Sequence, residues 1–303
     1  MTAKLTVVIP THDRAALLPG AIASVLSSPL IDSPRDVIVV DDLSSDATPE
    51  VAARTGVRYE RGRLGSPSAS RNAGLALAKT EFVAFLDDDD EWLPGNMEPQ
   101  LQALSRDRDA AYAYGRVQMV APNGMRAGEP YPYPPIRSGR IVSSIFLRPP
   151  QVGAVLFRRS TVVAAGGFDV RIRFGEDWDL LIRLAAAHPV IGVDFVGSLF
   201  RQRPPSMRDG EARWRAHRDF ARLRRKWRAA GYSFPLRARI AENIHQRGLT
   251  AYQLCHDAQA VLAAGAKNDA MRLIGYSMRV SPLHTLLRQP VFWKVLAGGI
   301  FAR

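Results

Sequence analysis

The sequence predicts an α/β fold with a mainly parallel, mixed sheet flanked by helices, followed by a helical C-terminal region. Short apolar runs rich in β-branched residues alternate with segments of helical periodicity over the first 90 residues. That alternation is typical of βαβ units and a parallel sheet. After Pro204 and Pro205 the composition changes to long Arg-rich helical patterns. We therefore expect two domains, residues 1–204 and 205–303.

Buried strands are predicted wherever short apolar runs are bounded by polar or turn residues. Helices are predicted where apolar residues recur at three- and four-residue spacing, and Thr48-Pro49-Glu50 gives one of them a cap and a first-turn proline. The Pro-rich segment 130–150 is expected to be a long ordered loop or lid. The predicted strands are 5–9, 37–40, 57–59, 82–86, 111–120, 152–157, 190–193 and 198–200, and the predicted helices of this domain are 17–26, 48–56, 66–79, a short helix before Gly166 and 176–187.

The positive charge of the chain is concentrated in its last third. Residues 1–200 contain 21 Lys and Arg against 23 Asp and Glu, whereas residues 201–303 contain 20 against 6. This asymmetry favours an anionic partner for the C-terminal region. Helices are expected there at about 211–230, 237–247, 250–265, 267–280 and 284–301.

Composition excludes several classes of protein. With 303 residues, 47% of them hydrophobic, the chain can bury a core without disulfides, and its single Cys255 forms no internal framework. No run of 18 or more apolar residues predicts a membrane span. The apolar run 5–9 is too short for a signal peptide, so a cytoplasmic protein is expected. The chain also lacks a G-x-G-x-x-G fingerprint and a Walker-type loop.

Carboxylates follow three of the four predicted N-terminal strands. Asp13 follows the first strand, Asp41 and Asp42 follow the second, and the consecutive residues Asp87, Asp88, Asp89 and Asp90 follow the fourth. Because ligands bind where parallel strands end, these side chains are candidates for a common site. A divalent cation would relieve the repulsion among four consecutive aspartates, and oxygen ligands suit Mg²⁺ or Mn²⁺.

Five segments in order resemble the family 2 glycosyltransferases. They are V-V-I-P-T-H-D-R at 7–14, V-V-D-D-x-S-x-D at 39–46, S-R-N-x-G at 70–74, F-L-D-D-D-D-x-W-x-P at 85–94, and G-G-F-D followed by G-E-D-W-D-L at 166–180. The resemblance covers residues 4–200 and implies a GT-A fold and an inverting enzyme that uses a nucleotide sugar. His12 and Asp13 stand where that family often has Tyr and Asn, which bears on the choice of base.

The resemblance also implies roles for single residues. Asp42 would accept a hydrogen bond from the nucleobase, and Arg71 would lie beside the base or the phosphates. Asp87, Asp88 and Asp89 match the Asp-x-Asp motif, with Asp89 and Asp90 nearest the ribose and the metal ion. The segment Pro10, Thr11, His12 and Arg14 would border the nucleobase.

Asp177 occupies the position of the catalytic base of that family. A carboxylate there would take the proton of the acceptor hydroxyl group during attack, although an acidic residue in a first helical turn is also favoured by the helix dipole alone. Glu176 and Trp178 are expected at the acceptor site, and Trp178 could equally belong to the core.

The predicted function is therefore metal-dependent, inverting transfer of a sugar from a nucleoside diphosphate to a hydroxyl group of a glycan or lipid-linked acceptor. UDP or dTDP is favoured as the carrier and GDP is possible. The basic C-terminal helices suggest peripheral contact with an anionic membrane surface, and no nucleic acid is expected. A nucleotidyltransferase and a non-catalytic module that binds anionic lipid or nucleic acid remain the alternatives.

Overall fold

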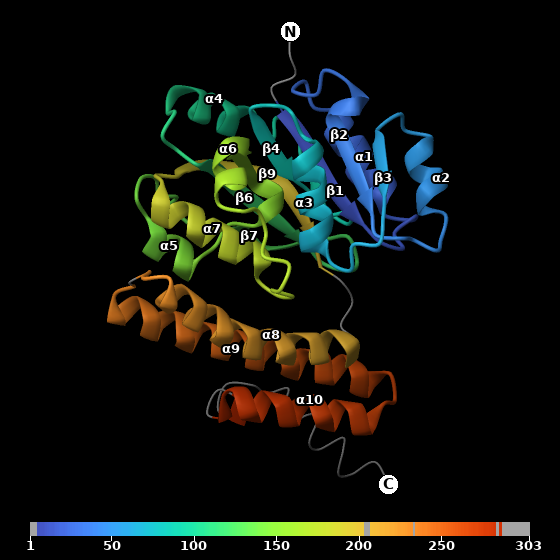
Figure 1. Ribbon diagram of the computed structural model, residues 1–303. Helices are drawn as coiled ribbons and strands as arrows, with labels where there is room; N and C mark the ends of the chain where they lie inside the picture. Colours follow the sequence, from blue (N-terminus) through green and yellow to red (C-terminus); the bar gives the residue numbers. More distant parts are fainter. Residues whose placement is uncertain (1–4, 203–206, 233, 283–284, 287–303) are drawn as a thin grey trace. The chain divides into compact units, whose positions relative to one another are not determined.

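The computed structural model describes residues 5–202, 207–232, 234–282 and 285–286. The chain forms two compact units, Met1–Gln202 and Arg203–Arg303. The first unit is a mixed sheet with helices on its faces, and the second consists of long helices (Figure 1). The predicted fold class is confirmed.

One half of the sheet is parallel and is formed by the first four strands. The helices between these strands each have a proline in their first turn. Proline is tolerated there because the first backbone amides of a helix have no partner within it, so the missing N–H of proline costs no hydrogen bond. The elements are β1 (Leu5–Thr11), α1 (Leu18–Leu26), a 3₁₀ turn (Pro34–Asp36), β2 (Val37–Asp41), α2 (Thr48–Ala53), β3 (Arg58–Arg61), α3 (Pro67–Leu77) and β4 (Phe82–Phe85).

The other half of the sheet is mixed. The spatial order is β3-β2-β1-β4-β8-β6-β9-β5, with β7 paired to β6, and β8 is antiparallel to both of its neighbours. The elements are β5 (Glu91–Trp92), α4 (Glu98–Arg106), β6 (Tyr112–Val120), β7 (Arg126–Tyr131), α5 (Val142–Leu147), a 3₁₀ turn (Val152–Ala154), β8 (Val155–Arg158), α6 (Arg159–Ala164), α7 (Glu176–Ala187) and β9 (Ile191–Arg201).

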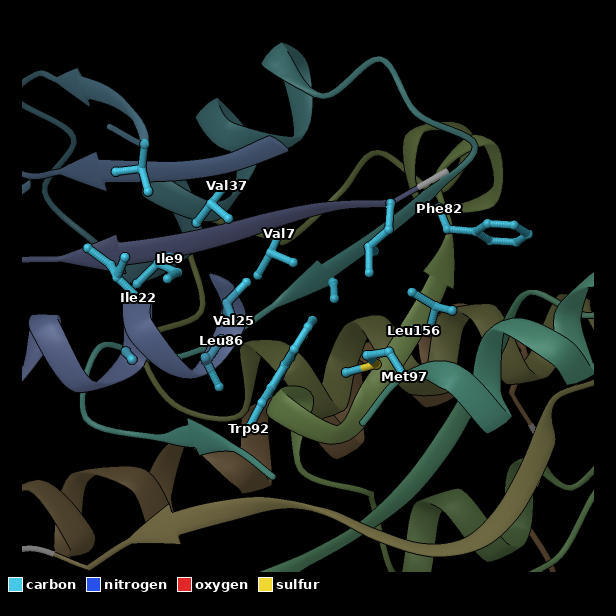
Figure 2. Packing of buried hydrophobic residues seen from close by; sticks show 14 of the residues in the cluster. Val7, Ile9, Ile22, Val25, Val37, Phe82, Leu86, Trp92, Met97 and Leu156 are labelled. Carbon is cyan, nitrogen blue, oxygen red and sulfur yellow. The ribbon is translucent and has the colours of Figure 1, made fainter. Parts of the chain in front are cut away.

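Alternate residues of β1 pack on opposite faces of the sheet. Val7 and Ile9 point to the face that carries α1, where Ile22 and Trp92 complete a fully or nearly fully buried cluster (Figure 2). Val8 points to the other face, where α3 packs so closely that Gly74 leaves no room for a side chain. Because both faces of β1 are covered, the carboxyl end of this strand is held at a fixed position.

The segment 130–150 differs from the predicted loop. It contains the end of β7 and the helix α5, and it is held against the sheet. Arg116 donates from Nε to the carbonyl oxygen of Pro132 at 3.1 Å and from Nη2 to that of Pro130 at 2.9 Å. Gly139 exchanges backbone hydrogen bonds with Val190. The sequence predicts an ordered loop or lid, and the structure agrees that the segment is held in place, but the prolines give no sign of the end of β7 or of the helix α5.

Other elements also differ from the predictions. The strands predicted at 190–193 and 198–200 form one strand, β9, whose pairing with β6 is irregular. Irregular pairing accommodates the polar and glycine residues that interrupt its apolar pattern. The pattern also fails to predict β5, which has only two residues, and α4.

The second unit has α8 (Met207–Ala229), α9 (Leu236–Ala263) and α10 (Lys267–Val280). Buried residues of α9 and α10, among them Leu254 and Leu273, form its core. The predicted helices 237–247 and 250–265 are one helix, α9, because packing against α10 outweighs the weak helix propensity of Gly248. The helix predicted at 284–301 lies outside the described residues, except Thr285 and Leu286.

No helix within the described ranges has both the length and the apolar character needed to cross a membrane.

The close packing of α3 on β1 predicts that an alanine is poorly tolerated at Gly74 but not at Gly20, a glycine of α1. A Cβ at position 74 would lie 2.3 Å from Cγ1 of Val8, so Gly74→Ala is expected to destabilise the first unit by about 1–3 kcal/mol. A Cβ at position 20 would meet only the flexible end of Glu91, at 3.1 Å. Gly20→Ala is the matched control and should leave the midpoint of urea unfolding nearly unchanged; equal midpoints for the two variants would contradict this packing.

Candidate active site

Three loops meet at one edge of the sheet, because β1, β2 and β4 run parallel and end there. Pro10 and Thr11 are the buried last residues of β1, whereas the side chain of His12 is 60% exposed. Nε of Arg14 lies 3.7 Å from Oδ1 of Asp88, which joins the loop after β1 to the loop after β4. The structure thus brings together Arg14 and Asp88, two of the residues predicted for nucleotide binding.

Crossed hydrogen bonds connect the loops after β1 and β2. The amide of Asp13 donates to Oγ of Ser44 at 2.9 Å, and the amide of Ser45 donates to Oδ1 of Asp13 at 2.6 Å. The hydrogen bond from Ser45 is the main reason why the pKa of Asp13 lies below its ordinary value. Asp13 and Leu43 both have positive φ, 52° and 56°. Asp13 therefore fixes the loop conformation.

Asp42 binds the backbone of a third loop. Its Oδ1 accepts a hydrogen bond from the amide of Leu64 at 2.6 Å, and its Oδ2 accepts one from the amide of Gly65 at 2.7 Å. A carboxylate oxygen can accept more than one hydrogen bond. The carboxylate of Asp42 therefore has a fixed orientation and retains acceptor capacity for a ligand.

Arg71 is the most deeply buried cation of the site, with 5% of its side chain exposed. Its Nη2 lies 2.6 Å from Oδ1 of Asp87, and its Nη1 lies 2.8 Å from Oε1 of Glu176. Burial alone would lower the pKa of Arg71, but these two carboxylates raise it above its ordinary value. Phe168 covers the guanidinium at 5.4 Å. Arg71 thus connects the end of β4 to the start of α7.

Asn72, beside Arg71 on α3, holds another segment of the same edge. Its side chain donates to the carbonyl oxygen of Phe168 at 2.8 Å and accepts from the amide of that residue at 2.9 Å. Oδ1 of Asn72 would lie 2.5 Å from a Cβ at Gly167, so only glycine fits there. The sequence gives Asn72 no role, although its place beside Arg71 in the segment 70–74 is a signal for one.

The four consecutive aspartates after β4 have different environments. Asp87 binds Arg71, and burial is the main cause that raises the pKa of Asp88 to about 6. Burial, followed by the charge of Asp87, raises the pKa of Asp90 well above its ordinary value. Asp90 accepts a hydrogen bond at 2.9 Å from the amide of Arg201, at the end of β9. The sequence does not predict this contribution of Arg201.

Asp89 is half-buried and lies between two buried aspartates. Within residues 5–202 and the other described ranges, no group of three or more His, Cys, Asp or Glu side chains is arranged to hold a metal ion. A Mg²⁺ site of one or two carboxylates completed by substrate phosphates needs no such group.

Asp177 lies in the first turn of α7, after Gly175, whose φ of 79° turns the chain into the helix. Its Oδ1 accepts a hydrogen bond from the amide of Trp178 at 2.8 Å. Burial, followed by the negative charge of Glu176, raises the pKa of Asp177 to about 6, while Arg71 opposes this increase. A carboxylate with such a pKa can accept a proton near neutral pH.

Trp178 lies in the packing between α5 and α7. Only 3% of the residue is exposed, and its indole nitrogen donates to the carbonyl oxygen of Ile145 at 3.2 Å. Its ring centroid lies 6.1 Å from that of Phe146. Of the two residues predicted at the acceptor site, Trp178 thus belongs to the core, and Glu176 is paired with Arg71.

Residues 6–148 match the family model described as Glycosyl transferase family 2. A GalNAc(5)-diNAcBac-PP-undecaprenol beta-1,3-glucosyltransferase from Campylobacter jejuni is 37% identical over 110 residues, which cover 33% of this chain and 34% of that protein. The succinoglycan biosynthesis protein ExoU from Rhizobium meliloti is 30% identical over 216 residues, which cover 59% of this chain and 56% of that protein. The chain thus spans less than two thirds of the length of these relatives.

The crystal structure of S. aureus TarS 1-349 in complex with UDP-GlcNAc superposes with a TM-score of 0.54. The match covers 91% of this chain and 92% of that chain at 16% sequence identity. At this identity the likeness shows the fold, and the expected GT-A fold is confirmed. Neither alternative, a nucleotidyltransferase or a non-catalytic module, is represented among these matches.

The buried bridge of Arg71 predicts a large loss of stability when the cation is removed. Arg71→Met would leave Asp87 and Glu176 without their cation, and is expected to destabilise the first unit by about 3–5 kcal/mol. Arg171→Met is the matched control, because the side chain of Arg171 is 84% exposed in its pair with Asp169. The control should cost less than about 1 kcal/mol in chemical denaturation. A cost for Arg71→Met no larger than that would show that the bridge does not hold the site together.

Proposed function

Because residues 6–148 match the model of glycosyl transferase family 2, we propose that this chain belongs to that family and transfers a sugar from a nucleoside diphosphate to a hydroxyl group of a glycan or lipid-linked acceptor, with inversion at the anomeric carbon. The observation that carries this proposal is the connection through Arg71 of two groups of carboxylates, the aspartates after β4 and the first turn of α7. The first group would hold a metal ion beside the diphosphate, and the second would supply the base that activates the acceptor.

The nucleotide binds at the loops after β1 and β2. Asp42, held by two backbone amides, accepts the ring N–H of the base, with Arg14 and His12 at its border. The complex of TarS with UDP-GlcNAc supports UDP as the carrier, and dTDP shares the same ring N–H. Arg71 is occupied by Asp87 and Glu176, so its role is to position those carboxylates beside the phosphates.

Asp89 and Asp90 would hold Mn²⁺ or Mg²⁺. The crowding of four carboxylates fits this role, because the raised pKa of Asp90 reflects burial and negative neighbours that a cation would offset. A metal ion held there would supply positive charge to offset the negative charge that develops on the leaving diphosphate.

Asp177 takes the proton of the acceptor hydroxyl group. As the new bond from that oxygen to the anomeric carbon forms, the bond from the carbon to the phosphate oxygen breaks, and the nucleoside diphosphate leaves with the electron pair. One base and attack on the opposite face give inversion. Glu176 keeps Asp177 basic through its charge, and Trp178 fixes the first turn of α7 from the core.

The reaction takes place in the cytoplasm, at the surface of the membrane where lipid-linked acceptors are anchored. Two observations support this location. The relative from C. jejuni is named as acting on an undecaprenol-linked glycan, and residues 201–303 contain 20 Lys and Arg against 6 Asp and Glu.

Removal of the base should slow transfer strongly and stabilise the fold. Asp177→Asn is expected to reduce kcat/KM by about 10²–10⁴-fold, whereas Asp194→Asn, which removes an exposed carboxylate of β9, should leave it unchanged. The wild-type rate should fall tenfold per pH unit below about 6, as Asp177 becomes protonated. A pH profile without this acidic limb would contradict the assignment.

The same variant gives a second measurement. Because the pKa of Asp177 is higher in the folded state than in the unfolded state, its ionisation removes stability as the pH rises through about 4 to 6. At pH 7, Asp177→Asn should therefore unfold at a higher denaturant concentration than the wild type. The corresponding increase in the free energy of unfolding is about 1–3 kcal/mol. The difference should disappear at pH 4.

A thermal-shift panel tests the donor and the metal ion. With UDP, dTDP, GDP or CDP at saturation and Mn²⁺ present, one carrier should raise the Tm by several degrees, because 100-fold excess over Kd contributes about 2.7 kcal/mol. EDTA or Asp89→Asn should remove most of that shift, and a nucleoside monophosphate should give little of it. No shift with any carrier would contradict the proposal. Release of pyrophosphate instead of a nucleoside diphosphate in a product assay would favour a nucleotidyltransferase.

A further inference from the structure

The turn between α8 and α9 presents apolar side chains to solvent. We name residues 225–240, without residue 233 and the side chains of 237–239, the hairpin tip. Leu236 is 66% exposed and Ile240 is 51% exposed, and a spacing of four residues places them on one face of α9. Ala229 and Ala230 at the end of α8 and Pro235 just before α9 are also exposed. Together they form an apolar projection.

The hairpin tip has a well-packed base. Trp227 and Phe234 are 1% and 7% exposed, and their rings meet edge to face with centroids 6.4 Å apart. Gly231 has a φ of 80°, which a helix end of this type requires, and the amide of Tyr232 donates to the carbonyl oxygen of Trp227 at 2.9 Å. Leu236 and Ile240 are therefore exposed on a folded support.

Arginines line one face of α8 up to the hairpin tip. A helix places residues at three- and four-residue spacing on one face. Arg218 and Arg225 form no ion pair with any residue that the structure describes, whereas Arg215 pairs with Glu211 and Arg222 pairs with Asp219. This arginine face consists of the exposed residues Arg215, Arg218, Arg222, Arg225 and Arg228.

We propose that the hairpin tip docks on an anionic lipid bilayer, with Leu236 and Ile240 in the interfacial layer and the arginine face on the headgroup phosphates. Apolar side chains on one surface beside basic residues are the pattern of an interfacial membrane contact. Each arginine near the surface strengthens such binding about fivefold. The inference rests on the membrane location proposed above and names the surface that makes the contact, and vesicle binding is measured separately from sugar transfer, so one can fail without the other.

Nucleic acid fits this surface less well. Proteins that bind single strands stack bases on accessible aromatic rings, but the two tryptophans of α8 already pack against other rings of the second unit. Trp214 is stacked on Tyr276 at 5.3 Å and an interplanar angle of 2°, and Trp227 is buried. The exposed apolar residues of the hairpin tip are aliphatic, which suits acyl chains. A second copy also fits poorly, because pairing of two tips would bring their arginines together.

The first experiment is cosedimentation of the full chain with neutral phosphatidylcholine vesicles and with vesicles that also contain phosphatidylglycerol. The wild type should bind only the anionic vesicles, and salt should weaken the binding. Leu236→Ser with Ile240→Ser, and separately Arg225→Gln with Arg228→Gln, should each reduce the partition coefficient by about tenfold or more. Met271→Ser and Arg279→Gln on exposed positions of α10 are the matched controls and should change it less than about twofold.

A fluorescent label shows which residue enters the bilayer. Cys255 is the single cysteine and is fully buried, so Leu236→Cys provides one accessible thiol for an environment-sensitive dye. Anionic vesicles should shift its emission to the blue, while a dye on Met271→Cys should not respond. Three results would each overturn the proposal. The wild type could bind neutral and anionic vesicles equally, or both dyes could respond equally. Variants of the hairpin tip could also weaken the binding of a single-stranded oligonucleotide while leaving the binding of vesicles unchanged.

Discussion

The site depends on one buried cation. Arg71 lies on α3 and binds carboxylates from two segments that would otherwise repel each other, Asp87 after β4 and Glu176 at the start of α7. An unpaired buried charge is costly, so the three groups hold one another in place. Asn72 adds the segment before α7 to the same assembly. The close packing of α3 on β1, which Gly74 permits, fixes the position of this bridge relative to the sheet.

The parallel half of the fold could be predicted because its information is local. Each of its strands is a short apolar run, and each following helix has its own periodicity and a proline in its first turn. The mixed half could not be predicted to the same extent. β5 is too short to produce a pattern, and β9 contains Gly192, Asp194 and Gly197, which divide its apolar residues into two runs. Its continuity comes from pairing with β6.

The site residues were predictable in kind but not in their contacts. Four aspartates after a buried strand and an acidic first turn of a helix indicate a charged site from sequence alone. Their contacts depend on packing between segments far apart in the chain. Examples are the pairing of Arg71 with Asp87 and Glu176, the hydrogen bond from Arg201 to Asp90, and the place of Trp178 in the core. Local patterns contain no information on such pairs.

The contacts that assemble the site also determine when it can form. Arg71 and Glu176 are 105 residues apart in sequence, Asn72 and Phe168 are 96 apart, and Asp90 and Arg201 are 111 apart. Loop closure over such distances costs chain entropy before any contact compensates for it. During synthesis, the parallel strands emerge and can pair well before α7 and β9 are available. Asp87 can meet Arg71 early, because these residues are 16 apart, whereas Asp90 gains the amide of Arg201 only after the end of β9 has been made. The full set of contacts at the site is therefore possible only once residues 1–201 have been synthesised.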